Sequence, residues 1–174
     1  MIDSGEIHSS YLSSIIAPVF KGASKLEPPN YRPVSLTSHL IKIFERVIQS
    51  KVIHYLEENK LLSCNQHGFR KGCSCLSELL AHFNEIYENL GNQMDTDTLY
   101  LDFSKAFDKV DHALLIKRLE RYGIKGKLLR WIKAFLSNRT QKVVVNGKMS
   151  LVDLVLSGVP QGTVLGPLLF LLCE

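Results

Sequence analysis

Asp102 has the clearest chemical potential of any residue in this sequence, because of the pattern around it. Residues 98–103 alternate with the two-residue rhythm of a β-strand and are rich in residues that favour strands. A short link follows, and Asp111 can then cap a helix. An acid near the end of a strand, followed by a turn and a helix, is a common way to hold a metal ion at a sheet edge. The alternative is a buried strand that ends in an ordinary solvated aspartate.

The length and composition allow one hydrophobic core, or two small lobes that share one. The chain has 174 residues, of which 45% are hydrophobic, and its formal net charge is +4. That excess is a weak indication of a polyanionic partner, but its distribution says more. Residues 117–142 contain nine lysines and arginines against a single acid, Glu120. They are either the solvated faces of two helices or a surface that follows a nucleic-acid backbone.

Cysteine usage and the lack of export signals favour an intracellular protein, in the cytoplasm or the nucleus. Cys64-x-x-His67 followed by Cys73-x-Cys75 imitates a zinc site, but the second pair is spaced more tightly than in zinc knuckles. We therefore expect reduced thiols. No secretory signal is visible, and the longest apolar run, residues 164–173, is too short to span a bilayer, so we expect no membrane partner.

A hairpin near the N-terminus can bring two cations together. Strands are predicted at 15–20 and 31–36, with a loop between them that has Lys21 and Arg32 at its ends. Such a hairpin can direct both cations at one anion, such as a triphosphate. It can equally be a surface hairpin with incidental charges.

Four amphipathic helices are predicted from apolar residues at helical spacing. Their expected ranges are 38–58, 75–90, 111–123 and 126–137. The second has an apolar stripe that we expect to face a core: Leu76, Leu79, Leu80, Phe83, Tyr87 and Leu90. The loop before it contains His67-Gly68-Phe69-Arg70-Lys71-Gly72, which can grip a nucleic-acid backbone or be an ordinary surface loop.

The C-terminal part contains a second hairpin and an apolar end. Asn146-Gly147 is a strong two-residue turn signal between strands predicted at 141–145 and 151–156. The sequence then stops on an apolar, helix-like run at 163–173, without a cap or a polar tail. We interpret this as a chain that is cut short, with an apolar face left uncovered.

Three stretches, in this order, resemble one protein family, with a fourth, Gln66-His-Gly-Phe-Arg-Lys-Gly72, between the first two. They are Asn30-Tyr-Arg-Pro-Val-Ser-Leu36, Leu101-Asp-Phe-Ser-Lys-Ala-Phe-Asp108 and Gly158-Val-Pro-Gln-Gly-Thr-Val-Leu-Gly-Pro-Leu-Leu-Phe170. Together they resemble the reverse transcriptase of non-LTR (LINE-type, Jockey-like) retrotransposons, over about residues 15–174. Viral and group II intron polymerases are weaker alternatives.

The resemblance implies an α+β fold, namely part of a right-hand polymerase. Residues 1–14 would be a loosely ordered N-terminus and 15–95 the helical fingers. Residues 96–174 would be a partial palm with an incomplete antiparallel sheet, and there would be no thumb. The implied partners are an RNA template, a DNA primer and a deoxynucleoside triphosphate (dNTP).

The same resemblance implies roles around the central motif. Asp102 would ligate both catalytic Mg²⁺ ions, with the backbone carbonyl of Phe103 as a further ligand. Ser104, Lys105 and Ala106 would lie along the incoming triphosphate, the last two donating backbone N–H groups. Phe107 would be the steric gate that packs under the deoxyribose and rejects a 2′-hydroxyl.

Further residues of the resemblance would bind nucleotide, template or primer. Arg32, together with Lys21, would bind the triphosphate from the fingers. Gln161 and Gly162 would lie beside the nascent base pair and the template, and the 66–72 loop would contribute Arg70 and Lys71 to the template and primer.

One departure from the family pattern concerns catalysis. The aromatic-x-Asp-Asp motif, expected a few tens of residues after residue 170, is absent from this sequence. The nearest acids downstream of Asp102 belong to the link (Asp108), the helix cap (Asp111) and the second hairpin (Asp153). One carboxylate cannot hold two Mg²⁺ ions with useful affinity. We therefore expect a fragment of an RNA-directed DNA polymerase that does not polymerise alone.

Two other hypotheses remain open at this point. The chain could be a non-catalytic nucleic-acid-binding remnant that keeps the basic helices and the fingers. It could also be an unstable translated relic, because the strand at 98–103 would lack a partner and the helix at 163–173 would be uncovered.

Overall fold

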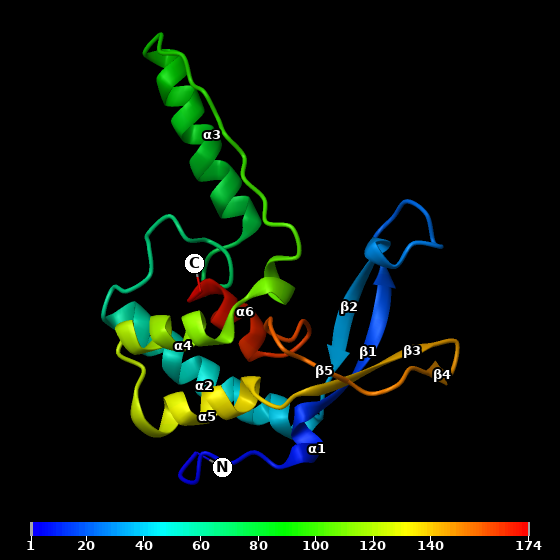
Figure 1. Cartoon of the computed structure of the whole chain (residues 1–174). Coiled ribbons are helices and arrows are strands. Elements are labelled where there is room, and N and C mark those ends of the chain that lie inside the picture. The colour runs from blue at the N-terminus through cyan, green and yellow to red at the C-terminus, as the bar shows by residue number, and fades with distance from the viewer. Residues whose placement is uncertain (1, 174) are drawn as a thin grey trace. The chain divides into compact units, whose positions relative to one another are not determined.

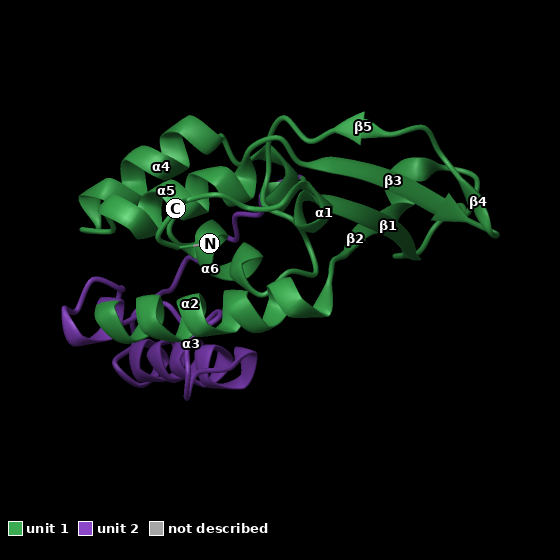
Figure 2. Ribbon diagram, turned by 90° about the horizontal axis from the view of Figure 1, so that it is seen from below, with its two compact units in different colours: residues 1–55, 105–174 green, residues 56–104 purple. Residues whose placement is uncertain are grey.

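The structure is a computed structural model that describes residues 2–173. It contains helices and a mixed sheet, which confirms the predicted α+β class. The chain forms two compact units (Figure 2). Unit 1 consists of the described residues up to Tyr55 and from Lys105 onward, and unit 2 is Leu56–Ser104. The boundary predicted between fingers and palm at 95/96 is a different division and stays a prediction.

The sheet of unit 1 joins both predicted hairpins. β1 (Ser13–Phe20) and β2 (Tyr31–Leu36) pair in antiparallel fashion, with Ile16 opposite Ser35. β3 (Thr140–Val145) pairs in parallel with the other side of β1. The strand order is β2-β1-β3-β4, where β4 is Lys148–Met149, and β5 (Asp153–Leu154) also pairs with β3 (Figure 1). The sheet is therefore mixed, whereas we expected an antiparallel palm sheet.

The second hairpin forms at the predicted turn. Asn146 and Gly147 both have positive φ angles, 49° and 76°, as a two-residue hairpin turn requires. The returning chain does not form one strand over 151–156. It pairs with β3 at once as β4 (Lys148–Met149) and again as β5 (Asp153–Leu154).

The core of unit 1 is built mainly by helices, which form close to their predicted positions. These helices are α1 (Ser9–Leu12), α2 (His39–Glu58, which continues into unit 2), α4 (His112–Arg121), α5 (Gly126–Leu136) and α6 (Leu165–Leu171), with short 3₁₀ turns η1 (Pro28–Asn30) and η2 (Ala106–Lys109). Asp111 caps α4 as predicted, its Oδ1 accepting the Leu114 N–H at 2.8 Å. The buried apolar residues include Ile41, Ile48, Leu115, Leu119, Trp131, Phe135, Leu165, Leu168 and Leu169.

The C-terminal helix is not uncovered. Leu165, Leu168 and Leu169 of α6 are all at most 2% exposed. Figures 1 and 2 both show α6 lying among α2, α4 and α5. The expectation of an exposed apolar end was wrong, because helices that come earlier in the chain cover this run.

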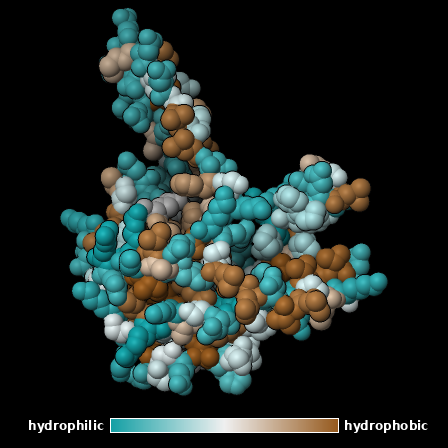
Figure 3. All heavy atoms as spheres, viewed as in Figure 1, coloured by the Kyte–Doolittle hydropathy of each residue, from teal (hydrophilic) through white to brown (hydrophobic). Residues whose placement is uncertain are grey.

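Unit 2 is organised around α3 (Cys75–Gly91), and its apolar stripe has no cover. The helix begins with a capping box in which Ser74 and Ser77 exchange side-chain and backbone hydrogen bonds at 3.1 and 2.9 Å. None of its residues is buried, so the prediction of a core-facing stripe was wrong. Figure 3 shows apolar side chains at the surface of α3. Unit 2 contributes no second long helix that could pack on them.

The predicted central strand at 98–103 does not form. Residues 95–103 have no regular structure, and Leu99, Tyr100 and Leu101 are each about 80% exposed. The segment runs back along α3 (Figure 1), where the Tyr100 hydroxyl and His82 Nε2 share a hydrogen bond of 3.0 Å. A strand needs a neighbour to satisfy its N–H and C=O groups. No strand among residues 2–173 pairs with this one.

Candidate functional site

The loop 157–163 brings the three motif-bearing segments of unit 1 together. On one side it docks on the turn that contains Phe107 and Asp108. The N–H of Gly158 donates to the carbonyl of Val110, and the N–H of Val159 to that of Phe107, both at 2.8 Å. The Ser157 hydroxyl donates to the Asp108 carbonyl at 3.0 Å. These bonds fix the loop to the second half of the central motif.

On its other side the loop lies against β2. The N–H of Ser35 donates to the carbonyl of Gln161 at 2.7 Å. Gly162 follows with a φ of +93°, and a Cβ there would lie 2.9 Å from the Ser35 carbonyl oxygen. A side chain at position 162 would therefore push the loop off the strand.

Two side chains tie the loop more closely to the motif turn. Gln161 Nε2 donates to Asp108 Oδ1 at 2.9 Å, in a half-buried position. Since a carboxylate only accepts, this bond leaves the Gln161 Oε1 available as an acceptor. His112 Nε2 lies 2.7 Å from the Gly158 carbonyl, so that nitrogen must carry the proton. The carboxylate of Asp108 is thus occupied by an amide.

A pocket of about 380 Å³ lies between this loop and one face of the sheet. Its polar lining includes Ser14, Ser35, Asp108, Gln141 and Gln161. Apolar side chains such as Ile16, Pro33 and Val159 complete its walls. The pocket thus combines apolar walls with hydrogen-bonding groups, as ligand pockets commonly do.

A buried pair of opposite charges lies behind the loop, and no sequence pattern indicates it. Glu45 of α2 is 0% exposed, and its Oε2 accepts the N–H groups of Val164 and Leu165, both at 2.8 Å. Arg139 is 1% exposed and donates to the Phe135 carbonyl at 3.2 Å. Burial raises the pKa of Glu45 above its ordinary value, an effect opposed by those two N–H groups and by Arg139. Burial also lowers the pKa of Arg139, and Glu45 opposes that shift.

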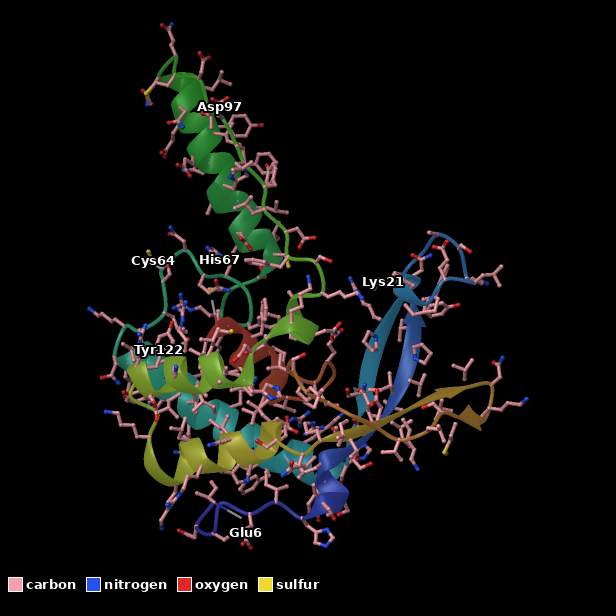
Figure 4. The ribbon with its side chains drawn as sticks, in the orientation of Figure 1. Glu6, Lys21, Cys64, His67, Asp97 and Tyr122 are labelled. Atoms are coloured by element: carbon pink, nitrogen blue, oxygen red, sulfur yellow. The ribbon has the colours of Figure 1, made fainter. Side chains whose placement is uncertain are left out.

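The predicted triphosphate cations lie on the hairpin, away from the pocket face. Arg32 is paired with Val19, and the ladder continues with the Lys21 N–H donating to the Asn30 carbonyl at 2.9 Å. By the two-residue alternation of strands, Lys21 and Arg32 share the face opposite to that of Ser35. Both are exposed, and Figure 4 shows Lys21 at the end of β1. The register therefore places Lys21 and Arg32 on one face of the hairpin, which is not the face of the pocket, and their binding of a triphosphate stays a prediction.

Phe107, the predicted sugar gate, packs on α6. Its ring stacks on Phe170 with centroids 4.6 Å apart and planes 17° from parallel. Ala106 opens η2, and Lys105 before it has a left-handed φ of 54°. Phe107 is thus held by a residue of the third motif.

The first half of the central motif does not form a metal site. Asp102, Phe103 and Ser104 are exposed and belong to unit 2, whereas Lys105 begins the second segment of unit 1. Within residues 2–173 there is no group of three or more His, Cys, Asp or Glu side chains placed to hold a metal ion. A magnesium site needs several hard oxygen ligands, so the arrangement around Asp102 does not fit one.

The loop 61–74 of unit 2 uses its polar groups internally. Arg70 Nη1 donates to the carbonyls of Ser63 and Gln66, at 2.7 and 3.3 Å, while Lys71 is exposed. His67 Nδ1 and the Ser77 hydroxyl share a hydrogen bond of 2.8 Å, and Figure 4 shows His67 and Cys64 on this loop. Cys64, Cys73 and Cys75 form no disulfide, and the Cys64 thiol donates to Asn65 Oδ1 at 3.4 Å.

Asp108 and Gln161 should prove energetically coupled. We expect Asp108→Ala and Gln161→Ala each to lower the free energy of unfolding by about 1–3 kcal/mol, because each removes a part-buried, charge-assisted hydrogen bond. The double variant should fall short of the sum by about 1 kcal/mol. Urea denaturation of the four proteins measures this, with Asp153→Ala as a control at an exposed carboxylate. Strict additivity would show that the contact contributes nothing.

The sequence motifs, the α+β fold and the contact of the motifs at the loop 157–163 together indicate a class of protein. Residues 21–173 match the reverse transcriptase (RNA-dependent DNA polymerase) family. Because the match covers most of the chain, this chain belongs to the reverse transcriptase family. No helix in the described part of the chain is long and apolar enough to cross a membrane.

Several relatives are RNA-directed DNA polymerases of Drosophila mobile elements, which confirms the resemblance to Jockey-like retrotransposons. The chain is 32% identical to the probable RNA-directed DNA polymerase from transposon BS of Drosophila melanogaster, over 86% of this chain and 16% of that protein. It is also 32% identical to the RNA-directed DNA polymerase from mobile element jockey of the same species, over 98% of this chain and 19% of that protein. A type-1 retrotransposable element R2 polyprotein of Popillia japonica is 28% identical over 82% of this chain and 20% of its own length. The chain thus spans about a fifth or less of these relatives.

Proposed function

We propose that this chain is the part of a retrotransposon reverse transcriptase that contacts the incoming nucleotide and the template. The observation that supports this most directly is the loop 157–163, which joins Ser35 of the first motif to Phe107 and Asp108 of the second. In the right-hand arrangement, the β1–β2 hairpin with α2 and α3 would belong to the fingers. The segment from about residue 96 would belong to the palm.

Within this proposal the predicted residues other than Arg70 keep their roles. Arg32 and Lys21 bind the triphosphate, Phe107 lies under the sugar, and Ser104, Lys105 and Ala106 line the phosphates. Gln161 offers its Oε1 to the nascent base pair, and Gly162 leaves room for the template beside β2. Arg70, whose guanidinium is held by its own loop, would orient that loop, and Lys71 would contact the template or primer.

We further propose that the chain does not extend a primer by itself. The family uses divalent metal ions, and Asp102 with the Phe103 carbonyl would be Mg²⁺ ligands in an intact parent. In this chain Asp102 belongs to no group of three or more His, Cys, Asp or Glu side chains that could hold a metal ion, among the described residues. Binding and positioning of nucleotide and template are therefore the functions that the chain's own residues support.

Primer extension tests this proposal. The purified chain, an RNA template annealed to a DNA primer, Mg²⁺ and all four dNTPs should give no extended product. The same chain should shift the RNA–DNA hybrid in a gel, with an affinity that falls as salt rises. A Lys21→Ala, Arg32→Ala variant should weaken binding of a labelled dNTP to the hybrid complex. Template-dependent extension by the chain alone would contradict the proposal.

A second candidate function is a non-catalytic nucleic-acid-binding remnant. It is favoured by a set of exposed cations on and between α4 and α5: Lys117, Arg118, Arg121, Lys125, Lys127, Arg130 and Lys133. The two functions differ in their dependence on dNTPs. A remnant would bind RNA equally well with and without the complementary dNTP, and it would lose binding on neutralisation of these helices. For either function, we propose an intracellular site, in the cytoplasm or the nucleus.

A further inference from the structure

Glu45 is the one buried acid in the described part of the chain, and it lies outside every family motif. Glu45 lies in α2, and an acid on an amphipathic helix ordinarily faces water. Taking a carboxylate out of water costs several kcal/mol unless hydrogen bonds and an opposite charge compensate. Its contacts therefore indicate what the burial achieves.

The hydrogen bonds of Glu45 are made with the chain that follows the Pro160-Gln161-Gly162 turn. The Oε2 of Glu45 accepts two consecutive N–H groups, from Val164 and Leu165, at 2.8 Å each. One turn further along α2, Gln49 Nε2 donates to the Val164 carbonyl at 3.2 Å. Helix α2 thus binds both backbone polar groups of Val164. The two N–H groups lie at the start of α6, where no earlier turn supplies acceptors.

The turn itself is too tight to move independently of Val164. The Thr163 hydroxyl donates to the Pro160 carbonyl at 2.8 Å and accepts the Gly166 N–H at 3.1 Å. A Cβ at Gly166 would lie only 2.6 Å from the Pro160 carbonyl oxygen. The position at which α2 holds Val164 is therefore transmitted to Gln161 and Gly162 over a few residues.

We propose that Glu45 is a positioning residue for the Pro160–Gly162 turn: it sets where Gln161 and Gly162 lie against β2. This inference rests on the proposed function, because it assigns Glu45 to the same nucleotide and template site. Arg139 supplies an opposite charge, which opposes the rise in the pKa of Glu45 that burial causes. The proposal differs from an ordinary helix cap in one respect. A cap would affect only the start of α6, whereas a positioning residue also affects the contact of the turn with β2.

The Ser35 amide reports that contact. Its N–H donates to the Gln161 carbonyl at 2.7 Å, and it lies on a different element from Glu45. We expect Glu45→Ala to raise the hydrogen-exchange rates of the Val164, Leu165 and Ser35 amides by roughly ten- to a hundredfold, since a charge-assisted hydrogen bond is lost. Amides in the core of α5, such as that of Phe135, should not change. Glu45→Gln keeps an acceptor and should restore much of the protection.

Two further variants keep the test decisive. Gln49→Ala removes only the bond to the Val164 carbonyl and serves if Glu45→Ala does not fold; it should accelerate Ser35 exchange by a smaller factor. Glu57→Ala, the same change near the end of α2, is the control and should leave Ser35 unaffected.

Three results would overturn the proposal: faster exchange at Val164 and Leu165 with Ser35 unchanged, no change at any of the three amides, or a uniform increase over the whole chain. The readout involves no nucleic acid. A chain that failed to bind the RNA–DNA hybrid would therefore contradict the proposed function while leaving this measurement intact.

Discussion

Gly158→Ala should lower the free energy of unfolding by about 2–4 kcal/mol, the sum of backbone strain and a collision. Gly158 has a φ of +85°, which L-residues with a Cβ rarely adopt. A Cβ there would lie 2.8 Å from the Cα and carbonyl oxygen of Asp108 and from the carbonyl oxygen of Phe107. All three are backbone atoms, so no side-chain rotation can relieve the contact. Chemical denaturation of the purified variant measures the loss.

Gly147→Ala is the matched control for this substitution. Gly147 also has a positive φ, +76°, but a Cβ there would meet nothing within 4 Å. Only the conformational strain remains, and we expect Gly147→Ala to lower the free energy of unfolding by about 1 kcal/mol. The difference between the two variants therefore isolates the close approach of the loop to the motif turn. Equal losses would mean that the loop does not pack on that turn as the structure has it.

Trp131→Ala should lower the free energy of unfolding by about 3–5 kcal/mol, because it opens a cavity in the helical core. Trp131 is 0% exposed. Its ring stacks on Phe135 at 5.3 Å between centroids and meets Phe44 of α2 at 5.2 Å. The wild-type chain should unfold cooperatively on heating, as followed by circular dichroism, and the variant should melt at a clearly lower temperature.

Trp131→Phe separates the ring from its polar atom. The indole Nε1 is buried without a hydrogen-bond partner, which is costly in itself. Phenylalanine keeps most of the ring and removes that group. We therefore expect the free energy of unfolding to stay within about 1 kcal/mol of the wild-type value. A wild-type chain that melts without a cooperative transition would support the relic hypothesis and remove the basis for both variants.

The sequence was most informative where structure depends on neighbours in the chain. The apolar spacing of residues 38–58 and the turn at Asn146-Gly147 predicted α2 and the second hairpin correctly, because both depend on short-range rules. Strand β2 formed over the expected residues 31–36 for the same reason. The parallel pairing of β1 with β3 could not be anticipated, since it joins residues more than 120 positions apart and leaves no local pattern.

Errors arose where a pattern needed a partner that the described chain does not supply. The alternation at 98–103 is a property of strands inside a sheet, and it cannot create the neighbouring strand. The stripe on α3 is likewise a surface for packing, and none of the residues of α3 is buried. Glu45 was missed for the opposite reason. An acid on an amphipathic helix ordinarily faces water, and only the position of α6 shows why this one is buried.

The division of the central motif between the two units sets a limit on distance. Asp102 lies in unit 2 and Phe107 in unit 1, with five peptide links between them. A chain of that length spans at most about 18 Å when fully extended. Whatever the arrangement of the units, Asp102 is therefore tethered within a short radius of Phe107.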